Sequence, residues 1–473
     1  MRSIPEIIVP LRLDDEAGRG SLPVRLAAEF RRLIGETVLL PGDAVPSSRA
    51  LAAHLGISRG SVVAAYDQLL AEGYLSASPG RSTVVNPHLR RVQPQPRSAP
   101  HDRPAEARAE LDLRPGLPWE GDVVGAAWKA AWRQASVEPV DVAVPALGLL
   151  DLRVALAEHL RRMRAVVRDP GHLAVTGGGR EGFALLLLAL GDGNPARLRV
   201  GVEEPGYPSL RRVPARFGAS VVPLPVDEHG LRVAELPMGA DAPELLVVTP
   251  SHQYPLGGSM PVDRRQALID WAARHCVVIV EDDYDSELRY TSEPLPALAA
   301  LDDPVDGRTV LLGTLAKTLT PALATGFLAL PSWLRPRIAE ACEELGQPVG
   351  LVAQRAVAHY LRSGALRLHT QRMRNRYRRR RAQVVAALAE VRGIRVYPMD
   401  GGLHAVVETA RPETEVVAAL AASGVWVSPL SQYWSGAGNS GIVFGFAAVG
   451  EAELSRGLRL IARCVRSQGE ASI

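Results

Sequence analysis

One lysine, Lys317, stands out in a chain that otherwise uses arginine for positive charge. The sequence holds 54 lysines and arginines together, and Lys129 and Lys317 are its only lysines. A guanidinium stays protonated, whereas an amine can lose its proton and attack a carbonyl to form a Schiff base. Lys317 follows an apolar run, 309–313, that is typical of a buried strand, whereas Lys129 lies in an ordinary helical pattern. We therefore predict that Lys317 is a Schiff-base residue.

Carboxylates follow a second apolar run upstream of Lys317. Residues 277–280 are a continuous β-branched segment, typical of a strand buried on both faces, and the sequence Glu-Asp-Asp-Tyr-Asp follows at 281–285. Side chains at the carboxyl end of a buried parallel strand lie where α/β proteins bind ligands. A pyridoxal-type cofactor needs a carboxylate against its pyridinium nitrogen and a hydroxyl near its phenolic oxygen. Asp282 and Tyr284 supply these two groups.

Three ordered motifs carry a resemblance to a known family. They read TPSHQYPLG at 249–257, EDDYDSELRY at 281–290 and GTLAKTLTP at 313–321. With them the chain resembles, over nearly its whole length, the MocR/GabR subfamily of GntR-type bacterial regulators. That resemblance implies a winged helix-turn-helix joined to a fold-type-I aminotransferase-like domain. It also implies pyridoxal 5'-phosphate as cofactor and a head-to-tail homodimer.

The resemblance also suggests how the rest of the cofactor would be held. Residues 176–181 form a glycine-rich turn between a predicted strand and a predicted helix, where main-chain amides can bind a phosphate. In the family this loop meets the cofactor phosphate, which points here to Gly178, Gly179 and Arg180. Tyr207, within EEPGYP at 203–208, matches the aromatic residue that stacks on the pyridine ring.

This sequence departs from the family pattern at several phosphate-binding positions. Ala316 and Ala324 stand where relatives usually carry a serine and an arginine, and residues 142–145 lack the tyrosine that reaches the partner subunit's phosphate. Arg180 stands where glutamine is common and could restore one charge. We expect weaker cofactor binding, since removing a charge-assisted hydrogen bond typically costs about 1.5–3 kcal/mol.

A further departure bears on enzyme activity. Residues 439–445, where aminotransferases and some relatives place an arginine for the substrate carboxylate, contain none. This argues against efficient transamination of α-amino acids. Whether the chain is an enzyme at all stays open at this point.

Composition sets broad limits. The chain has 473 residues, 47% of them hydrophobic and 22% charged, which is ordinary for a globular protein of two to four domains. Its net charge of +3 is too small to indicate a nucleic-acid partner by itself. The three cysteines show no metal-ligand spacing, so we predict no metal site and expect them reduced and mostly buried. No signal peptide and no run long enough to span a bilayer are visible. We expect a cytoplasmic protein without membrane contact.

The first 86 residues have the pattern of a winged helix-turn-helix. Helical periodicity over 22–36 is followed by a short helix to Leu55, a turn at Gly56, and a second helix that ends near Gly73. Short apolar segments at 74–77 and 82–85 then flank a Pro-Gly turn and predict a hairpin, the wing. Residues 41–62 closely resemble the GntR-type motif. A helical interaction module that binds no DNA is the alternative.

The candidate DNA contacts lie at helix N-termini and at the wing tip. The second helix of such a motif enters the major groove by its N-terminal end, where serine hydroxyls and arginines suit phosphate oxygens. The predicted contacts are Ser47, Ser48, Arg49, Ser58, Arg59, Ser61, Tyr66 and Arg81.

Residues 87–110 are proline-rich without periodicity and predict a linker between the DNA-binding domain, 1–86, and an effector domain, 111–473. In the effector domain, apolar segments at 173–176, 198–202, 219–224, 245–249, 277–281 and 309–313 alternate with helical patterns. This alternation predicts an α/β fold with a mostly parallel central sheet. The large part should span about 111–350, and a smaller α+β lobe about 351–473. The arginine-rich segment 366–381 is interpreted as a solvated helix face, with a secondary DNA contact as the alternative.

Three hypotheses about function follow. The leading one is a transcription regulator that binds an operator and senses pyridoxal 5'-phosphate, together with an amine or amino-acid effector. The second is a pyridoxal-phosphate-dependent aminotransferase with a DNA-binding appendage, which the missing arginine disfavours. The third is a regulator whose pocket has lost the cofactor, which Ala316 and Ala324 favour.

Overall fold

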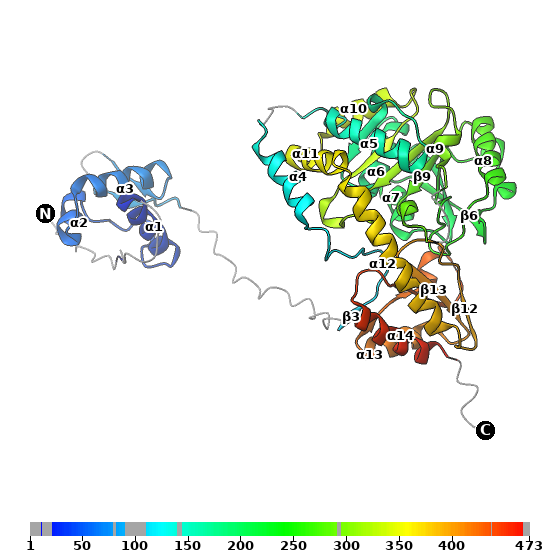
Figure 1. Cartoon of the computed structure of the whole chain (residues 1–473). Helices are drawn as coiled ribbons and strands as arrows, with labels where there is room; N and C mark the ends of the chain where they lie inside the picture. The colour runs from blue at the N-terminus through cyan, green and yellow to red at the C-terminus, as the bar shows by residue number, and fades with distance from the viewer. Residues whose placement is uncertain are drawn as a thin grey trace, which may run out of the picture. The chain divides into compact units, whose positions relative to one another are not determined.

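The computed structural model describes residues 11, 21–78, 82–89, 110–139, 144–290, 295–436 and 438–466. The chain divides into two compact units, Met1–Ala105 and Glu106–Ile473 (Figure 1). Most of the predicted linker, 87–110, lies outside the described residues, so its boundaries stay a prediction.

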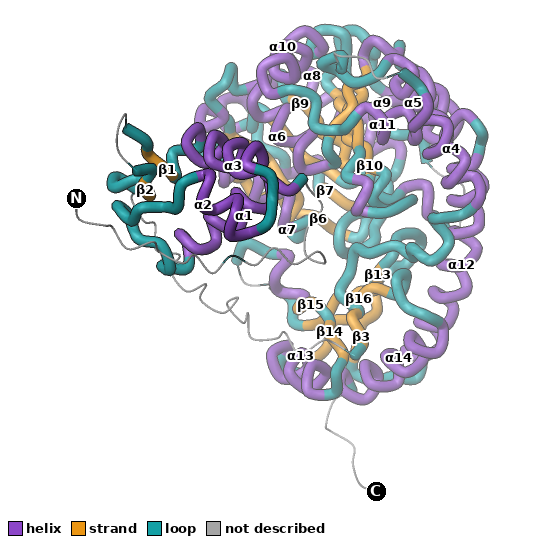
Figure 2. The backbone as a smooth tube through the Cα atoms, turned by 90° about the vertical axis from the view of Figure 1, so that its left-hand side faces the viewer, coloured by secondary structure: helices purple, strands orange, loops and turns teal. Residues whose placement is uncertain are grey.

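The first unit is a small helical domain with a two-stranded hairpin (Figure 2). Its elements are α1 (Leu22–Gly35), α2 (Ser48–Leu55), α3 (Arg59–Ala71), β1 (Leu75–Ser76) and β2 (Val84–Val85). Gly56 joins α2 to α3 at φ +65°, a left-handed conformation that glycine adopts without steric cost. Buried side chains from the three helices form one apolar core, in which the Phe30 and Tyr66 rings meet edge-on with centroids 5.5 Å apart. The predicted helix-turn-helix is confirmed.

The second unit is built on an eight-stranded sheet with the order β4-β11-β10-β9-β8-β5-β6-β7. The strands are β4 (Leu173–Thr176), β5 (Arg199–Glu204), β6 (Ser220–Asp227), β7 (Gly230–Leu231), β8 (Leu245–Val248), β9 (Val278–Asp283), β10 (Thr309–Thr314) and β11 (Gly326–Ala329). The neighbours from β10 to β6 all pair in parallel, which confirms the mostly parallel sheet. The short antiparallel strands β7 and β11 are absent from the sequence prediction.

Helices cover both faces of this sheet (Figure 2). They are α4 (Ala126–Val137), α5 (Leu150–Arg164), α6 (Gly179–Leu190), α7 (Pro208–Arg216), α8 (Val262–His275), α9 (Leu298–Leu301), α10 (Arg335–Leu345) and α11 (Leu351–Arg362). The alternating side chains of β9 show the two layers. Val280 packs in one apolar cluster with Phe183 of α6, whereas Ile279 packs in another with Leu268 of α8. A strand buried on both faces explains the continuous apolar run read from the sequence.

A smaller C-terminal lobe follows the long helix α12 (Ala365–Leu388), which runs into it from the large part (Figure 1). Its sheet has the order β12-β13-β16-β15. The lobe's elements are β12 (Ile394–Val396), β13 (His404–Thr409), α13 (Glu413–Ala422), β14 (Val425–Trp426), β15 (Ser428–Pro429), β16 (Gly441–Gly445) and α14 (Glu451–Val465). Strand β3 (Leu111–Asp112) pairs in parallel with β14. Residues 111–112 therefore belong to the small lobe and not to the large part, where we expected them, because a two-residue strand leaves no periodic signal.

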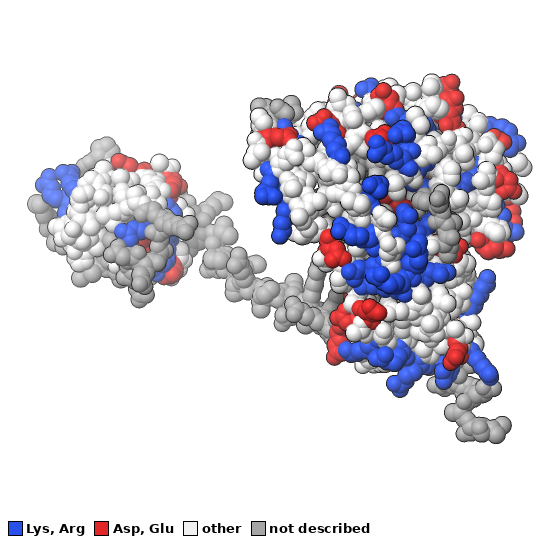
Figure 3. Space-filling model, in the orientation of Figure 1, with Lys and Arg blue, Asp and Glu red and all other residues white. Residues whose placement is uncertain are grey.

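The arginine-rich segment 366–381 is helical, as predicted, and basic side chains gather over α12 in Figure 3. Its interpretation as a solvated face is only partly right. Arg374, Arg378 and Arg381 donate hydrogen bonds to main-chain oxygens of other segments, and Arg380 is buried. These arginines therefore connect α12 to neighbouring segments by hydrogen bonds, in addition to making the helix basic.

Candidate functional site

Three consecutive carboxylates end strand β9, and their side chains alternate between the two faces of the sheet. Arg164 of α5 donates a hydrogen bond to Asp283 at 2.7 Å, and its guanidinium lies 3.8 Å from Glu281. Because successive side chains of a strand point to opposite faces, Asp282 faces the other way, into a pocket of about 420 Å³. Arg164 therefore pairs with Asp283 and lies near Glu281 on one face of the sheet, whereas Asp282 is left to the pocket.

Asp282 is a buried carboxyl with no hydrogen-bond donor among the described residues. Burial raises its pKa to about 8, with further contributions from the negative charges of Asp283 and Asp285, while the positive charge of Lys317 opposes the shift. An opposite charge placed against a buried carboxyl favours its ionised form. Asp282 is thus arranged to receive a cationic group from the pocket.

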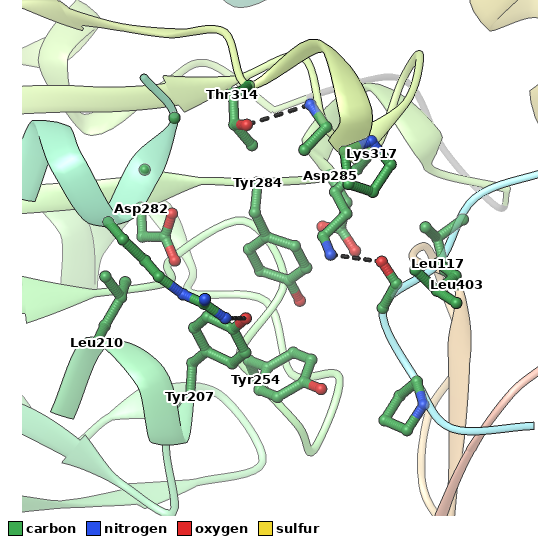
Figure 4. Close-up of a pocket in the computed structure, with 18 of the residues that line it drawn as sticks. Leu117, Tyr207, Leu210, Tyr254, Asp282, Tyr284, Asp285, Thr314, Lys317 and Leu403 are labelled. Carbon is green, nitrogen blue, oxygen red and sulfur yellow. Dashed lines mark hydrogen bonds between the residues drawn. The ribbon is translucent and has the colours of Figure 1, made fainter. Parts of the chain in front are cut away.

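Lys317 lies in the loop after β10 and lines the same pocket as Asp282 (Figure 4). The buried side chains of Leu315 and Leu319 anchor this loop on both sides of the lysine. The Lys317 amine donates a hydrogen bond to the main-chain oxygen of Gly116 at 2.5 Å. The structure thus brings together the amine and the carboxylate that the sequence predicted.

The glycine-rich turn also lines the pocket, at the N-terminus of α6. Gly178 has φ +105° and no atom near the place of a side chain, so the turn leaves open space above the helix end. Exposed Arg180 follows in the first turn of α6 and donates hydrogen bonds to Ser209 at 3.0 Å and to Tyr207 at 3.4 Å. Burial tends to raise the pKa of Tyr207, but the Arg180 hydrogen bond and the positive charge of Lys317 outweigh it and lower that pKa.

Ala316 and Ala324 both line the pocket, so the two departures from the family pattern lie at the site itself. Ala324 is in the left-handed region at φ +45°. The only cationic side chains that line the pocket within the described residues are Arg180 and Lys317. Residues 142–143, half of the segment from which the family's partner tyrosine is missing, lie outside the described residues.

Tyr254, Tyr284 and His404 form another wall of the pocket, and His252 contacts this wall without lining the pocket. Tyr284 donates its hydroxyl proton to the main-chain oxygen of His252 at 2.9 Å, and His252 Nδ1 lies 3.0 Å from Asp285. Burial lowers the pKa of His404 to about 4, with His252 contributing, so His404 is neutral. The rings of His404 and Tyr254 lie 4.8 Å apart. The expected Tyr284 hydroxyl is therefore at the site but already bonded to His252.

Sequence reasoning missed His252, Asp285 and His404. The first two stand inside motifs that carry the family resemblance, so the motifs themselves were the available signal. His404 lies in β13 of the small lobe, and nothing in its sequence surroundings connects it with the pocket.

The stretch 439–445 does not reach the pocket. It ends in the buried strand β16, and Asn439 donates hydrogen bonds to Tyr397 and Glu408 at 3.3 Å. No arginine of the small lobe takes its place among the described pocket residues.

The predicted DNA contacts cluster at the helix N-termini of the first unit. Ser47 caps α2 and accepts a hydrogen bond from the Ala50 amide, and Ser58 caps α3 and accepts one from the Ser61 amide, each at 3.1 Å. Arg59 donates to the Ser48 hydroxyl at 3.4 Å. Arg49 and Arg59 are exposed, and no described residue pairs with the Arg49 guanidinium.

One predicted contact is wrong and another cannot be located. Tyr66 is only 6% exposed, and its hydroxyl donates to the main-chain oxygen of Pro46 at 2.9 Å. It faces the core because it shares the inner stripe of α3 with Val62 and Leu69. Arg81 lies outside the described residues.

Membrane spans and metal clusters are both absent from the part of the chain that the structure describes. No helix there is long and apolar enough to cross a bilayer, and no three or more histidine, cysteine or acidic side chains group as metal ligands. All three cysteines are free thiols. Only Cys342 is buried, whereas Cys276 is exposed, so the expectation of mostly buried cysteines was wrong.

Comparison with known proteins identifies both units. Residues 23–85 match the family "Bacterial regulatory proteins, gntR family", and residues 118–460 match "Aminotransferase class I and II".

Two relatives match along most of their length. The chain is 46% identical to the HTH-type pyridoxine biosynthesis transcriptional regulator PdxR of Corynebacterium glutamicum, over 90% of this chain and 92% of the relative. It is 32% identical to the probable rhizopine catabolism regulatory protein MocR of Rhizobium meliloti, over 88% and 87%. Among solved structures, kynurenine aminotransferase of Pyrococcus horikoshii superposes with a TM-score of 0.68 at 21% identity. That alignment covers 76% of this chain and 92% of the other, and it shows a shared fold.

Proposed function

Because this chain belongs to the MocR/GabR subfamily, the GntR-type bacterial regulators with an aminotransferase class I and II domain, we propose that it senses pyridoxal 5'-phosphate. The chain is a DNA-binding transcriptional regulator. In our proposal the cofactor binds in the pocket of the second unit and changes the affinity of the winged helix for its operator. The observation that carries this proposal is the placement of Asp282 and Lys317 around one pocket.

The residues present fit the cofactor. Asp282 is a buried carboxyl without a donor among the described residues, and a protonated ring nitrogen would supply both a donor and a charge. Lys317 supplies the amine, and the open turn at Gly178 and Gly179 supplies main-chain amides at a helix N-terminus for the phosphate. When bound, pyridoxal phosphate offers an aldehyde that condenses with an amine.

Other residues would complete the binding site. Tyr207 would cover one face of the ring, and Arg180 would add positive charge near the phosphate. Tyr284, bonded to His252, would reach the phenolic oxygen only by sharing or exchanging that bond. Ala316 and Ala324 offer no polar side chain, which supports weak binding and hence occupancy that follows the cofactor concentration.

The pocket favours a sensor over an enzyme. An α-amino-acid substrate carries a carboxylate, and the described pocket residues include no arginine other than Arg180 at its edge. Burying an unpaired carboxylate is costly. For a second effector beside the cofactor, we propose an amine, or an amino acid whose carboxylate is not buried in the pocket.

The relative named as a pyridoxine biosynthesis regulator supports a specific target. At 46% identity over 90% of this chain, we propose that pyridoxine biosynthesis genes are regulated here too. We further propose that the protein works in the cytoplasm as a head-to-tail homodimer on double-stranded operator DNA. The described residues include no helix suited to span a membrane.

A DNA-binding titration with and without cofactor tests the proposal. Promoter DNA upstream of the pyridoxine biosynthesis genes would be titrated with cofactor-free protein and again with pyridoxal phosphate present. We expect the affinity to change in the wild type, whereas Lys317→Ala should bind DNA equally well under both conditions. A wild type that binds the cofactor without any change on DNA would reject the sensor. If the wild type binds no pyridoxal phosphate, the result would favour a regulator whose pocket has lost the cofactor.

A further inference from the structure

A second buried carboxyl, Glu203 of β5, lines a cavity together with Asp282. Glu203 is 5% exposed. Its Oε2 accepts hydrogen bonds from the Thr249 hydroxyl and, at 3.4 Å, from the Gln253 side-chain amide. Its Oε1 is buried and has no partner among the described residues. A buried carboxyl oxygen without a partner is costly and calls for an explanation.

The Glu203 and Asp282 side chains line one small cavity next to the main pocket. This cavity has a volume of about 20 Å³, and its lining includes Glu203, Asp282 and Thr249. A buried water needs roughly 10–15 Å³ and two to four polar partners. The Glu203 and Asp282 carboxyls both line the cavity, so it has the size and the polar groups for one water molecule.

From this geometry we infer that Glu203 is a positioning residue for Asp282. A neutral Glu203 donates its carboxyl proton to one buried water in the small cavity, and that water donates to the Asp282 carboxylate. This stabilises the ionised Asp282 against a protonated pyridine nitrogen. The inference rests on the proposed binding of pyridoxal phosphate and adds a residue that the site description did not contain.

The hydrogen bonds around Glu203 fix where its proton lies. Oε2 already accepts from two donors, so the proton of a neutral Glu203 sits on Oε1, the oxygen without a partner. Burial raises the pKa of Glu203 to about 7, which supports the neutral form.

The groups that face Glu203 do not offset this preference. Asp282 of β9 adds a second carboxyl, and Tyr207 lines the cavity with its aromatic ring. Arg211 of α7 also lines the cavity, but its guanidinium donates to the main-chain oxygens of Gln432 and Tyr433. Two ionised carboxylates at so small a cavity repel each other, so one of them stays protonated. Asp282 has the cofactor as counter-ion, which leaves the proton with Glu203.

Two substitutions test whether Glu203 acts as a neutral hydrogen-bond donor or as a negative charge. Glu203→Gln keeps a hydrogen-bond acceptor for Thr249 and supplies an amide donor in place of the carboxyl proton. Glu203→Met keeps the length of the side chain but removes both the acceptor and the donor. Pyridoxal phosphate titrations followed by absorbance should give wild-type affinity within about threefold for Gln and roughly tenfold weaker binding for Met. Glu204→Gln is the matched control, because the Glu204 carboxylate bonds to Ser435 instead and is not part of the cavity.

A cofactor analogue tests whether the weaker binding acts through Asp282. In 1-deaza-pyridoxal phosphate a carbon replaces the ring nitrogen, so the analogue cannot pair with Asp282. Wild type and Glu203→Met should bind this analogue equally. Equal weakening with both ligands would show a purely structural role and overturn the inference. So would a Gln variant as weak as Met, or a Met variant as tight as the wild type.

The pH dependence keeps the inference testable if Glu203→Met does not fold. Near pH 6 the wild type and Glu203→Gln should bind pyridoxal phosphate alike. Near pH 9 the wild type should bind more weakly than Gln, because only Glu203 can ionise. An affinity ratio that does not change with pH would overturn the inference. Wild-type protein that binds no cofactor at any pH would reject the proposed function, and this inference with it.

Discussion

Asp282 and Lys317 face one pocket from the ends of neighbouring parallel strands, β9 and β10. Asp282 is the register partner of Leu312 in β10, and the chain reaches Lys317 just beyond the end of that strand. The carboxyl edge of a parallel sheet is where ligands bind, since the loops after adjacent strands meet there. The fold thus places the Asp282 carboxyl and the Lys317 amine, from two different strand ends, at one pocket. The remaining walls of the pocket decide which ligand can use them.

Because the chain has only two lysines, substitution can test directly whether the Lys317 amine forms the Schiff base. We predict that Lys317→Ala abolishes the borohydride-reducible adduct with pyridoxal phosphate and its visible absorbance. Lys129→Ala removes the only other lysine, which is exposed on α4, and should leave both unchanged. Mass spectrometry of the reduced wild type should find the adduct on the peptide that contains Lys317. An adduct that survives in Lys317→Ala would show that another amine is used.

Residues that act within one motif could be predicted from the sequence, whereas residues assembled by the fold could not. The carboxylate, amine and glycine-rich turn each lie beside a recognisable strand. Glu203 and Thr249 meet only because β5 and β8 are neighbours in the sheet, and sequence order does not reveal that neighbourhood. His404 joins the pocket from the small lobe, again through tertiary packing.

Tyr66 shows an error that the sequence itself could have prevented. Its spacing of four from Val62 and three to Leu69 places it on the apolar stripe of α3. A tyrosine in a DNA-binding helix suggests a contact, but the helical period assigns it to the core. The β3–β14 pairing is a different case, because two-residue strands carry no usable pattern.

The DNA-binding unit should bind through Arg49 and Arg59. We predict that Arg49→Ala or Arg59→Ala weakens operator binding and makes the negative slope of log affinity against log salt shallower by about 0.9 for each phosphate that is no longer neutralised. Arg32→Ala is the matched control, because Arg32 already pairs with Glu29 in α1 and with Glu36 just after the end of that helix. Fluorescence anisotropy at several salt concentrations measures both effects. Unchanged slopes in Arg49→Ala and Arg59→Ala would show that neither arginine binds a phosphate.

The buried Asp282 should make the stability of the cofactor-free protein depend on pH. Its pKa of about 8 in the folded state lies above its value near 4 in the unfolded chain. Its contribution is therefore fully present below about pH 4 and is lost as the pH rises to about 8, by at most about 1.4 kcal/mol per pH unit. As the pH rises across this range, the thermal unfolding temperature should fall less steeply in Asp282→Asn than in the wild type. The exposed Asp241→Asn serves as control, and equal slopes in all three proteins would contradict the prediction.

Ala324 and Arg180 offer competing accounts of how the phosphate is held. Ala324 lines the pocket without a polar side chain, whereas Arg180 is exposed at the edge and bonded to Ser209. If Ala324 leaves a gap in the phosphate site, the wild type binds pyridoxal phosphate weakly. If Arg180 has replaced the family arginine, affinity is intact and depends on Arg180.

We predict that the gap is real and that Ala324→Arg tightens pyridoxal phosphate binding by roughly tenfold, through a charge-assisted hydrogen bond to the phosphate. Ala324 already has a positive φ, so an arginine there adds little new backbone strain. Ala322→Arg adds the same charge two residues away, at a position that does not line the pocket, and should change affinity much less. Titration of the cofactor-free proteins measures all three affinities. Tight binding by the wild type that disappears in Arg180→Ala would defeat this prediction and assign the phosphate to Arg180.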